Sequence, residues 1–184
     1  MTKEALVLID IQNDYFPGGK MELDGMDAAA ANARRILELF RRNHKPAFHI
    51  LHLAIQPGAT FFLPDTAGAE IHSSVAPLDG EPVIGKHFPN AFRDTPLRKK
   101  LADLNIERLT ICGAMSHMCI DTSVRAAFDL GFACQVVADA CATRQLEYGG
   151  MVVEAARVQA AFMAALGAVF AEITTTGDFV GLTA

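Results

Sequence analysis

The sequence has no clustered positive charge. Its 184 residues carry a net charge of −5, and the basic pairs Arg41-Arg42 and Lys99-Lys100 stand alone among polar neighbours. Proteins that bind nucleic acids or anionic membranes carry a basic patch or stripe that neutralises phosphate groups. We therefore expect neither a nucleic acid nor a membrane as a partner, and we interpret both pairs as solvated helix faces.

Long apolar runs, paired cysteines and linkers are also missing. No run is long enough to cross a bilayer and no signal-peptide pattern precedes the first predicted strand, so we expect a cytoplasmic protein. Cys112, Cys119, Cys134 and Cys141 form no Cys-x-x-Cys pair, which fits free thiols in a reducing compartment. With 51% hydrophobic residues and no repeats, residues 1–184 are expected to form a single globular domain.

Short apolar runs alternate with helical patterns along the chain. The apolar runs predict strands over residues 5–10, 46–53, 82–86, 108–113, 133–138 and 168–173. The helical patterns cover residues 27–43, 95–105, 119–132, 152–166 and 176–182, and we expect Asp27 and Thr95 to cap the first two. This alternation predicts a three-layer α/β/α fold with a mainly parallel six-stranded sheet and right-handed crossovers.

Three predicted strand ends carry side chains capable of chemistry. Asp10 ends the first strand, Lys86 ends the third, and Cys119 follows the fourth where a helix begins. The carboxyl ends of parallel strands share one edge of a sheet, so the three residues can meet if their strands are neighbours. Lys86 and the helix dipole would make the thiol more acidic, and Asp10 could accept its proton.

Each of these residues also has a purely structural interpretation. A single cysteine is more often a buried core residue, and an aspartate after a strand is more often a turn residue. A lysine is more often a solvated surface residue. The combination of the three, rather than any one of them, points to a catalytic site.

Three motifs give the chain a family resemblance. They are Asp10-Ile11-Gln12-Asn13-Asp14-Tyr15-Phe16, then Lys86 followed by residues 90–95, and finally residues 112–119. In this order and spacing they resemble the isochorismatase-like cysteine hydrolase superfamily, which includes nicotinamidases, N-carbamoylsarcosine amidohydrolases and ureidoacrylate-type hydrolases. The resemblance implies an isochorismatase-like, Rossmann-like fold and a catalytic triad of Asp10, Lys86 and Cys119.

The same resemblance implies features of the turn before the cysteine. It places a non-proline cis peptide between Ala114 and Met115, and an oxyanion hole at the backbone N–H groups of Met115 and Cys119. The implied reaction is attack of the thiolate on a carbonyl, loss of ammonia or an amine, and hydrolysis of the thioester by water. Residues close to the motifs are candidates for substrate binding: Phe16, Phe62, Asn90, Phe92, His117 and Met118. For Phe62 and Phe92, packing in the core or a subunit contact is at least as strong an alternative, and His117 could equally cap the turn.

No cofactor is implied. Nicotinamidases carry an Asp-x-His metal motif after the second strand, whereas residues 49–54 here read His-Ile-Leu-His-Leu-Ala. His49 and His52 are expected to point to opposite faces of their strand, so they cannot easily share a metal. A set built from His52, His72 and His87 is incomplete, and we expect no metal.

These features predict a hydrolase that cleaves the C–N bond of a small amide, ureido or carbamoyl substrate. Isochorismatases as a rule lack the nucleophilic cysteine, so Cys119 favours an amide over the vinyl ether of isochorismate. Isochorismate-type ether hydrolysis and a non-catalytic small-molecule-binding role are the alternatives. The resemblance also implies a homo-oligomer, a dimer or tetramer, in which the long loop over residues 54–81 is a candidate contact or lid.

Overall fold

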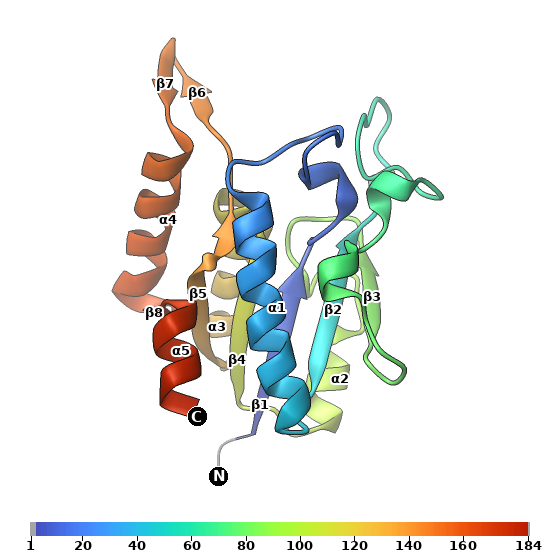
Figure 1. The fold of residues 1–184 in the computed structure, drawn as a ribbon, viewed down its shortest axis with the longest axis vertical. Coiled ribbons are helices and arrows are strands. Elements are labelled where there is room, and N and C mark those ends of the chain that lie inside the picture. The colour runs from blue at the N-terminus through green and yellow to red at the C-terminus, as the bar shows by residue number, and fades with distance from the viewer. Residues whose placement is uncertain (1–2, 184) are drawn as a thin grey trace.

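The computed structural model describes residues 3–183, and residues 1, 2 and 184 of the expected domain lie outside that range. A sheet of six parallel strands forms its centre, in the order β3-β2-β1-β4-β5-β8 (Figure 1). The strands are β1 (Glu4–Ile9), β2 (Ala47–His52), β3 (Val83–Lys86), β4 (Arg108–Ala114), β5 (Ala133–Ala142) and β8 (Glu172–Thr174). The predicted α/β fold with a six-stranded parallel sheet is confirmed.

Helices cover both faces of this sheet. They are α1 (Met26–Arg42), α2 (Leu97–Asp103), α3 (Asp121–Asp129), α4 (Ala155–Val169) and α5 (Thr176–Thr183). Helices α1 and α5 pack together in front of the sheet, α2 and α3 lie behind it, and α4 packs against α3 and β8 (Figure 1). Among residues 3–183, no helix combines the length and the apolar character that a bilayer span requires.

The helix starts differ in detail from the predicted caps. Helix α1 begins after Gly25 in the left-handed region (φ +71°) without a side-chain cap, and Asp27 lies inside its first turn. A carboxylate there still favours the positive end of the helix dipole. Thr95 lies two residues before the first position of α2, and its Oγ1 accepts a hydrogen bond from the Leu97 N–H (3.4 Å). The predicted apolar face of α1 is buried: Ala30, Ala33, Ile36, Leu37 and Phe40.

The region from 146 to 174 departs from the prediction. Two short strands, β6 (Leu146–Tyr148) and β7 (Met151–Val153), form an antiparallel hairpin where a helix start was expected. Gly149 and Gly150 both have positive φ, as a tight hairpin turn requires. Helix α4 therefore begins later, and its alanine-rich chain stays helical to Val169, so the last strand is shorter than predicted. The hairpin projects away from the sheet (Figure 1).

The long loop over residues 54–81 packs on the segment that follows β1. Gln12 and Ile71 form an isolated bridge, and the His72 N–H donates to the Ile11 carbonyl (2.8 Å). Two short 3₁₀ turns lie within this loop, Ala67–Ala69 and Ser73–Val75. The loop thus lies over the carboxyl edge of the sheet, next to the predicted catalytic residues.

Candidate active site

Asp10, Lys86 and Cys119 meet at the carboxyl edge of the sheet. The Lys86 ammonium donates hydrogen bonds to Asp10 Oδ2 (2.7 Å) and to Cys119 Sγ (3.2 Å). All three residues are buried. Strand β3 is not a neighbour of β1, because β2 lies between them. The long lysine side chain spans that gap, which a shorter cationic residue at the end of β3 could not do.

The sheet topology explains why the site forms here. From β1 the chain continues to β2 on one side, and from β4 it continues to β5 on the other side. The crevice between β1 and β4 is therefore the switch point at which open α/β sheets place their sites. A Cβ on Gly113 (φ +123°) would overlap the Ile9 carbonyl, so only glycine lets the end of β4 approach β1 this closely.

Cys119 lies in the turn that connects β4 to α3. Residues Ser116–Ile120 form a single π-helical turn that continues into α3. The inward face of this helix, formed by Ile120, Val124 and Ala127, is fully buried and fixes the turn against the sheet. The peptide bond between Ala114 and Met115 is cis, at the position that the family resemblance implies.

The electrostatics of Cys119 correct one prediction. Burial raises the pKa of the Cys119 thiol, the negative charge of Asp10 raises it further, and Lys86 only partly opposes them. The expected acidic thiol is wrong, because desolvation outweighs the helix terminus and the lysine. Burial alone would lower the pKa of the Lys86 ammonium, but Asp10 and Cys119 outweigh it and raise that pKa. The resting site is therefore a neutral thiol beside an Asp10–Lys86 ion pair.

One oxygen of Asp10 is free to accept a proton. Asp10 Oδ2 is bonded to Lys86, whereas Oδ1 is buried and has no hydrogen-bond partner among residues 3–183. A carboxylate oxygen of Asp10, a ring nitrogen of His52 and the Cys119 sulfur all lie within 4.8 Å of one another. A buried carboxylate oxygen without a donor is costly, and it is a strong acceptor for a nearby thiol proton.

The donor set around Cys119 does not resemble a metal centre. Asp10, His52 and Cys119 are the one group of donors in the described chain close enough to hold an ion. The ammonium of Lys86 already lies between these three side chains and is hydrogen-bonded to each of them. His72 Nδ1 instead contacts Ser74 Oγ (2.9 Å), and His87 Nδ1 donates to the Leu53 carbonyl (2.8 Å).

The aromatic candidates near the first motif lie in a cluster beside the site. Phe62 is buried and packs on Tyr15 (4.5 Å between ring centroids) and near His52 (6.1 Å). Phe16 stacks on His72, with ring centroids 3.7 Å apart. Phe62 therefore lies near His52, which contacts Lys86, and direct contact of either phenylalanine with substrate stays a prediction.

The remaining candidates come from the other side of the site. His117 Nδ1 contacts Thr143 Oγ1 (2.6 Å), which links the nucleophile turn to the end of β5. Asn90 Oδ1 accepts from the Phe92 N–H (2.9 Å), and the Phe92 ring stacks near Phe132 at the far end of α3. Asn90 and Phe92 therefore have structural roles here. Their contact with substrate, and that of the half-exposed Met118, stays a prediction.

Three residues of the site were missed from sequence. His52 contacts Lys86, Tyr15 is buried and feels the charges of Asp10 and Cys119, and the exposed Arg144 follows Thr143, which contacts His117. Burial raises the pKa of the Tyr15 phenol, and the charges of Asp10 and Cys119 raise it further. The position of Arg144 two residues after a strand is a pattern that can be seen in a sequence. The roles of His52 and Tyr15 depend on the order of the strands, which the sequence does not state.

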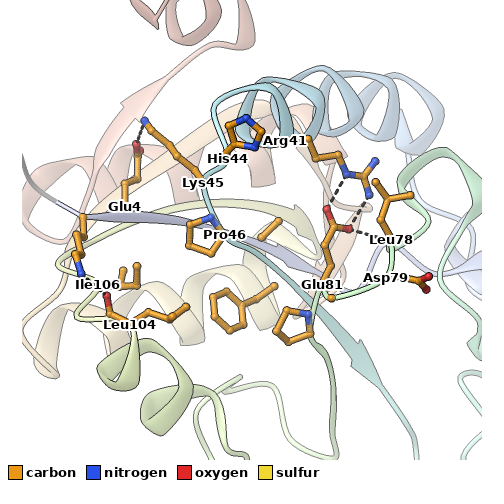
Figure 2. Close-up of a pocket in the computed structure, with 15 residues that line it drawn as sticks. Glu4, Arg41, His44, Lys45, Pro46, Leu78, Asp79, Glu81, Leu104 and Ile106 are labelled. Carbon is orange, nitrogen blue, oxygen red and sulfur yellow. Dashed lines mark hydrogen bonds and ion pairs between the residues drawn. The ribbon is translucent and has the colours of Figure 1, made fainter.

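A separate cavity lies at the opposite edge of the sheet. It has a volume of about 1000 Å³, and residues at the starts of β1, β2 and β3 line it (Figure 2). None of Asp10, Lys86 and Cys119 is among its lining residues. Arg41 donates twice to the Glu81 carboxylate (2.7 Å each), which also accepts from the Leu78 N–H (2.8 Å) (Figure 2). We interpret this cavity as structural, because Arg41 pairs with Glu81 and Lys45 pairs with Glu4 within its lining.

The Glu81 network leads to a stability prediction. Burial alone would raise the pKa of the Glu81 carboxyl, but hydrogen bonds from Arg41, Leu78 and His49 outweigh it and hold that pKa at about 2. An acid with a lowered pKa stabilises the fold above its ordinary pKa of 4.5 and loses that contribution as the pH falls towards 2. We expect Glu81→Gln to cost about 2 kcal/mol of unfolding free energy at pH 7, and less at pH 3. Thermal unfolding at both pH values measures this.

The matched control is Glu38→Gln. Glu38 is exposed and pairs with Arg34 one helical turn away, so its loss should change stability by less than about 0.5 kcal/mol. Equal melting temperatures for Glu81→Gln and the unsubstituted protein at pH 7 would contradict the assigned role.

A parallel α/β sheet with a buried cysteine, lysine and aspartate together at its carboxyl edge is typical of a cysteine hydrolase. The family model for the isochorismatase domain matches residues 4–178. The chain therefore belongs to the isochorismatase family of hydrolases.

Known proteins support this membership over nearly the whole chain. An uncharacterized isochorismatase family protein of Bacillus subtilis, YddQ, is 51% identical over 96% of this chain and 98% of its own length. The secreted isochorismatase effector Isc1 of Verticillium dahliae is 31% identical over 95% of this chain and 88% of its own. A crystal structure of an isochorismatase-family hydrolase from Oleispira antarctica superposes with a TM-score of 0.94 at 48% identity, covering 98% and 97% of the two chains.

A more distant relative carries an amidase name. The N-carbamoylsarcosine amidase of an Arthrobacter species is 30% identical over 71% of this chain and 56% of its own.

Proposed function

We propose that this chain is a cysteine hydrolase that cleaves the C–N bond of a small amide, ureido or carbamoyl substrate through a thioester on Cys119. The observation that carries the proposal is the buried contact of Lys86 with both Asp10 and Cys119, together with the free Oδ1 of Asp10. A structural core cysteine has no need of a buried ion pair beside it. The N-carbamoylsarcosine amidase among the relatives acts on a bond of the proposed class.

The geometry suggests how the reaction proceeds. Asp10 Oδ1 takes the proton of the Cys119 thiol as Sγ attacks the substrate carbonyl, and Lys86 remains charged beside the forming bond. The backbone N–H groups of Met115 and Cys119 would stabilise the oxyanion. When the C–N bond breaks, the leaving nitrogen receives the proton from Asp10. Water then attacks the thioester, gives a proton to the same carboxylate, and the acid product leaves as the thiol is restored.

The second candidate is hydrolysis of a vinyl ether such as isochorismate. The relative from Verticillium dahliae, described as an isochorismatase effector, favours it. Ether hydrolysis of that kind needs no thiol nucleophile, so it leaves the buried Cys119–Lys86 contact without a purpose. We therefore rank C–N hydrolysis first.

A substrate panel tests the two candidates. Amides, ureas and carbamoyl amino acids are screened for release of ammonia, and isochorismate for release of pyruvate, each with Cys119→Ala as the control. Release of ammonia that depends on Cys119 supports the proposal. Pyruvate without ammonia would replace it with ether hydrolysis, and no turnover with any compound would favour a binding role.

Arg144 suggests which members of the panel to expect. Ala142 pairs with Ala114, the first residue of the cis peptide bond. Arg144 lies two residues after Ala142 in the sequence. It is exposed and has no ion-pair partner among residues 3–183. Burial lowers the pKa of His117, and the positive charge of Arg144 lowers it further. His117 also contacts Thr143, the residue before Arg144. We propose that Arg144 attracts substrates that carry a carboxylate.

Arg144→Gln should raise the KM of a carboxylate-bearing substrate about tenfold, since one charge-assisted contact contributes about 1.4 kcal/mol. The kcat should change little, because the guanidinium does not touch the reacting atoms. Steady-state kinetics with an acidic substrate and its neutral amide analogue measure the effect. An equal rise of KM for both compounds would contradict recognition of a carboxylate.

A further inference from the structure

The Lys86 ammonium has three N–H donors, and three different side chains accept them. They are Asp10 Oδ2 at 2.7 Å, His52 Nδ1 at 2.9 Å and Cys119 Sγ at 3.2 Å. Because Lys86 is buried, a donor without an acceptor would carry the full cost of desolvation. The orientation of the ammonium is therefore set by all three acceptors together, and the family resemblance accounts for only two of them.

The sheet places His52 directly beside Lys86. Strand β2 lies between β1 and β3, and its last residue, His52, is paired in register with Lys86. In a parallel ladder, residues in register point to the same face of the sheet. The imidazole thus lies on the same face as the lysine side chain and within hydrogen-bond distance of its ammonium.

The backbone of His52 is held by a buried amide. Gln12 Oε1 accepts from the His52 N–H (2.8 Å), and Gln12 Nε2 donates to the His52 carbonyl (2.9 Å) and to the Ala69 carbonyl (2.7 Å). Gln12 is fully buried. This clamp joins the end of β2 to the segment after β1 and to the long loop, so the imidazole has little freedom to move away from Lys86.

The protonation of His52 fits an acceptor role. An ammonium can only donate, so Nδ1 must present its lone pair and the ring proton must sit on Nε2. Burial lowers the pKa of the His52 imidazole to about 4, with Lys86 and His87 lowering it and Asp10 opposing them. The ring is neutral at physiological pH and adds no second cation beside the lysine.

We propose that His52 is a positioning residue, which fixes the Lys86 ammonium so that one N–H stays directed at Cys119 Sγ and another at Asp10. The proposal rests on the function proposed above. Without this acceptor, the ammonium would rotate to find a partner for its third N–H. Its contact with the sulfur would lengthen first, because sulfur is the weakest hydrogen-bond acceptor of the three. Lys86 would then support the thiolate less well.

The test uses two substitutions of similar size. His52→Leu removes the acceptor, whereas His52→Asn keeps an acceptor oxygen at the position of Nδ1. We expect His52→Leu to lower kcat about tenfold to 100-fold with a smaller change in KM, and to shift the pH profile of Cys119 alkylation by iodoacetamide to higher pH. His52→Asn should restore most of both. Equal losses in the two variants, or a normal profile in His52→Leu, would overturn the proposal.

A measurement on the unsubstituted protein keeps the proposal testable if His52→Leu fails to fold. The ¹⁵N shifts of His52 should report a neutral ring with its proton on Nε2 from pH 8 down to about pH 5. A ring protonated on Nδ1 would overturn the proposal, since that nitrogen could not accept from Lys86. Cys119→Ala separates the two ideas. If that variant retains turnover, the proposed function fails, whereas loss of turnover with a normal His52→Leu variant rejects only the role of His52.

Discussion

Replacing Cys119 with alanine should lower kcat at least about 10³-fold, because the proposed thioester cannot form without the sulfur. The fold should persist. Cys119 is a small side chain, and the turn that carries it is held by the buried residues Ile120 and Val124 rather than by the sulfur. Turnover of the best substrate from the panel, together with thermal unfolding followed by circular dichroism, measures both expectations.

Cys134→Ala is the matched control for that experiment. Cys134 is also a buried free cysteine, but it lies at the start of β5, at the opposite edge of the sheet from the site. Its removal should leave kcat unchanged within about twofold. A mass increase equal to the acyl group on the unsubstituted protein, absent from Cys119→Ala, would identify the intermediate directly. Turnover in Cys119→Ala within tenfold of the unsubstituted protein would reject the nucleophile.

The fold could be predicted because its strands are hydrophobic on both faces. The run over residues 5–10 reads as a buried parallel strand, and β1 is indeed covered on both sides. The hairpin of β6 and β7 was missed for a physical reason. Its apolar residues also fit the start of a helical pattern, and both Tyr148 and Met151 are exposed, so no burial pattern distinguishes strand from helix there.

The sequence predicts which residues stand at the ends of strands, but it does not predict which of these residues come together in the site. Sequence places Asp10, Lys86 and Cys119 each after a strand, but the order of the strands decides which of them meet. The same order places His52 against Lys86, and no local pattern records that. The acidity of Cys119 was predicted wrongly because charge and helix position can be read from sequence, whereas the depth of burial cannot.

Asp10→Asn should separate the two roles that a carboxylate beside a thiol can have. The substitution removes the proton acceptor but keeps an oxygen that can accept from Lys86, so the buried lysine stays partnered. As the general base is lost, kcat should fall about 10³-fold. The negative charge of Asp10 raises the pKa of the Cys119 thiol, so its removal should lower that pKa. Alkylation of Cys119 by iodoacetamide at neutral pH should therefore become faster while turnover is lost.

Lys86→Met gives the opposite result and completes the argument. Lys86 lowers the pKa of the thiol, so its loss should slow alkylation, and turnover should fall as well. Both variants should lose turnover, but the rate of Cys119 alkylation should rise in one and fall in the other. A damaged site does not explain that pattern, since damage would change the exposure of the thiol without regard to the charge removed. Faster alkylation in Asp10→Asn would identify Asp10 as the base, because a thiol that is more reactive towards iodoacetamide would still fail to turn over substrate. Slower alkylation in both variants would instead mean that Asp10 acts only by holding Lys86 in place.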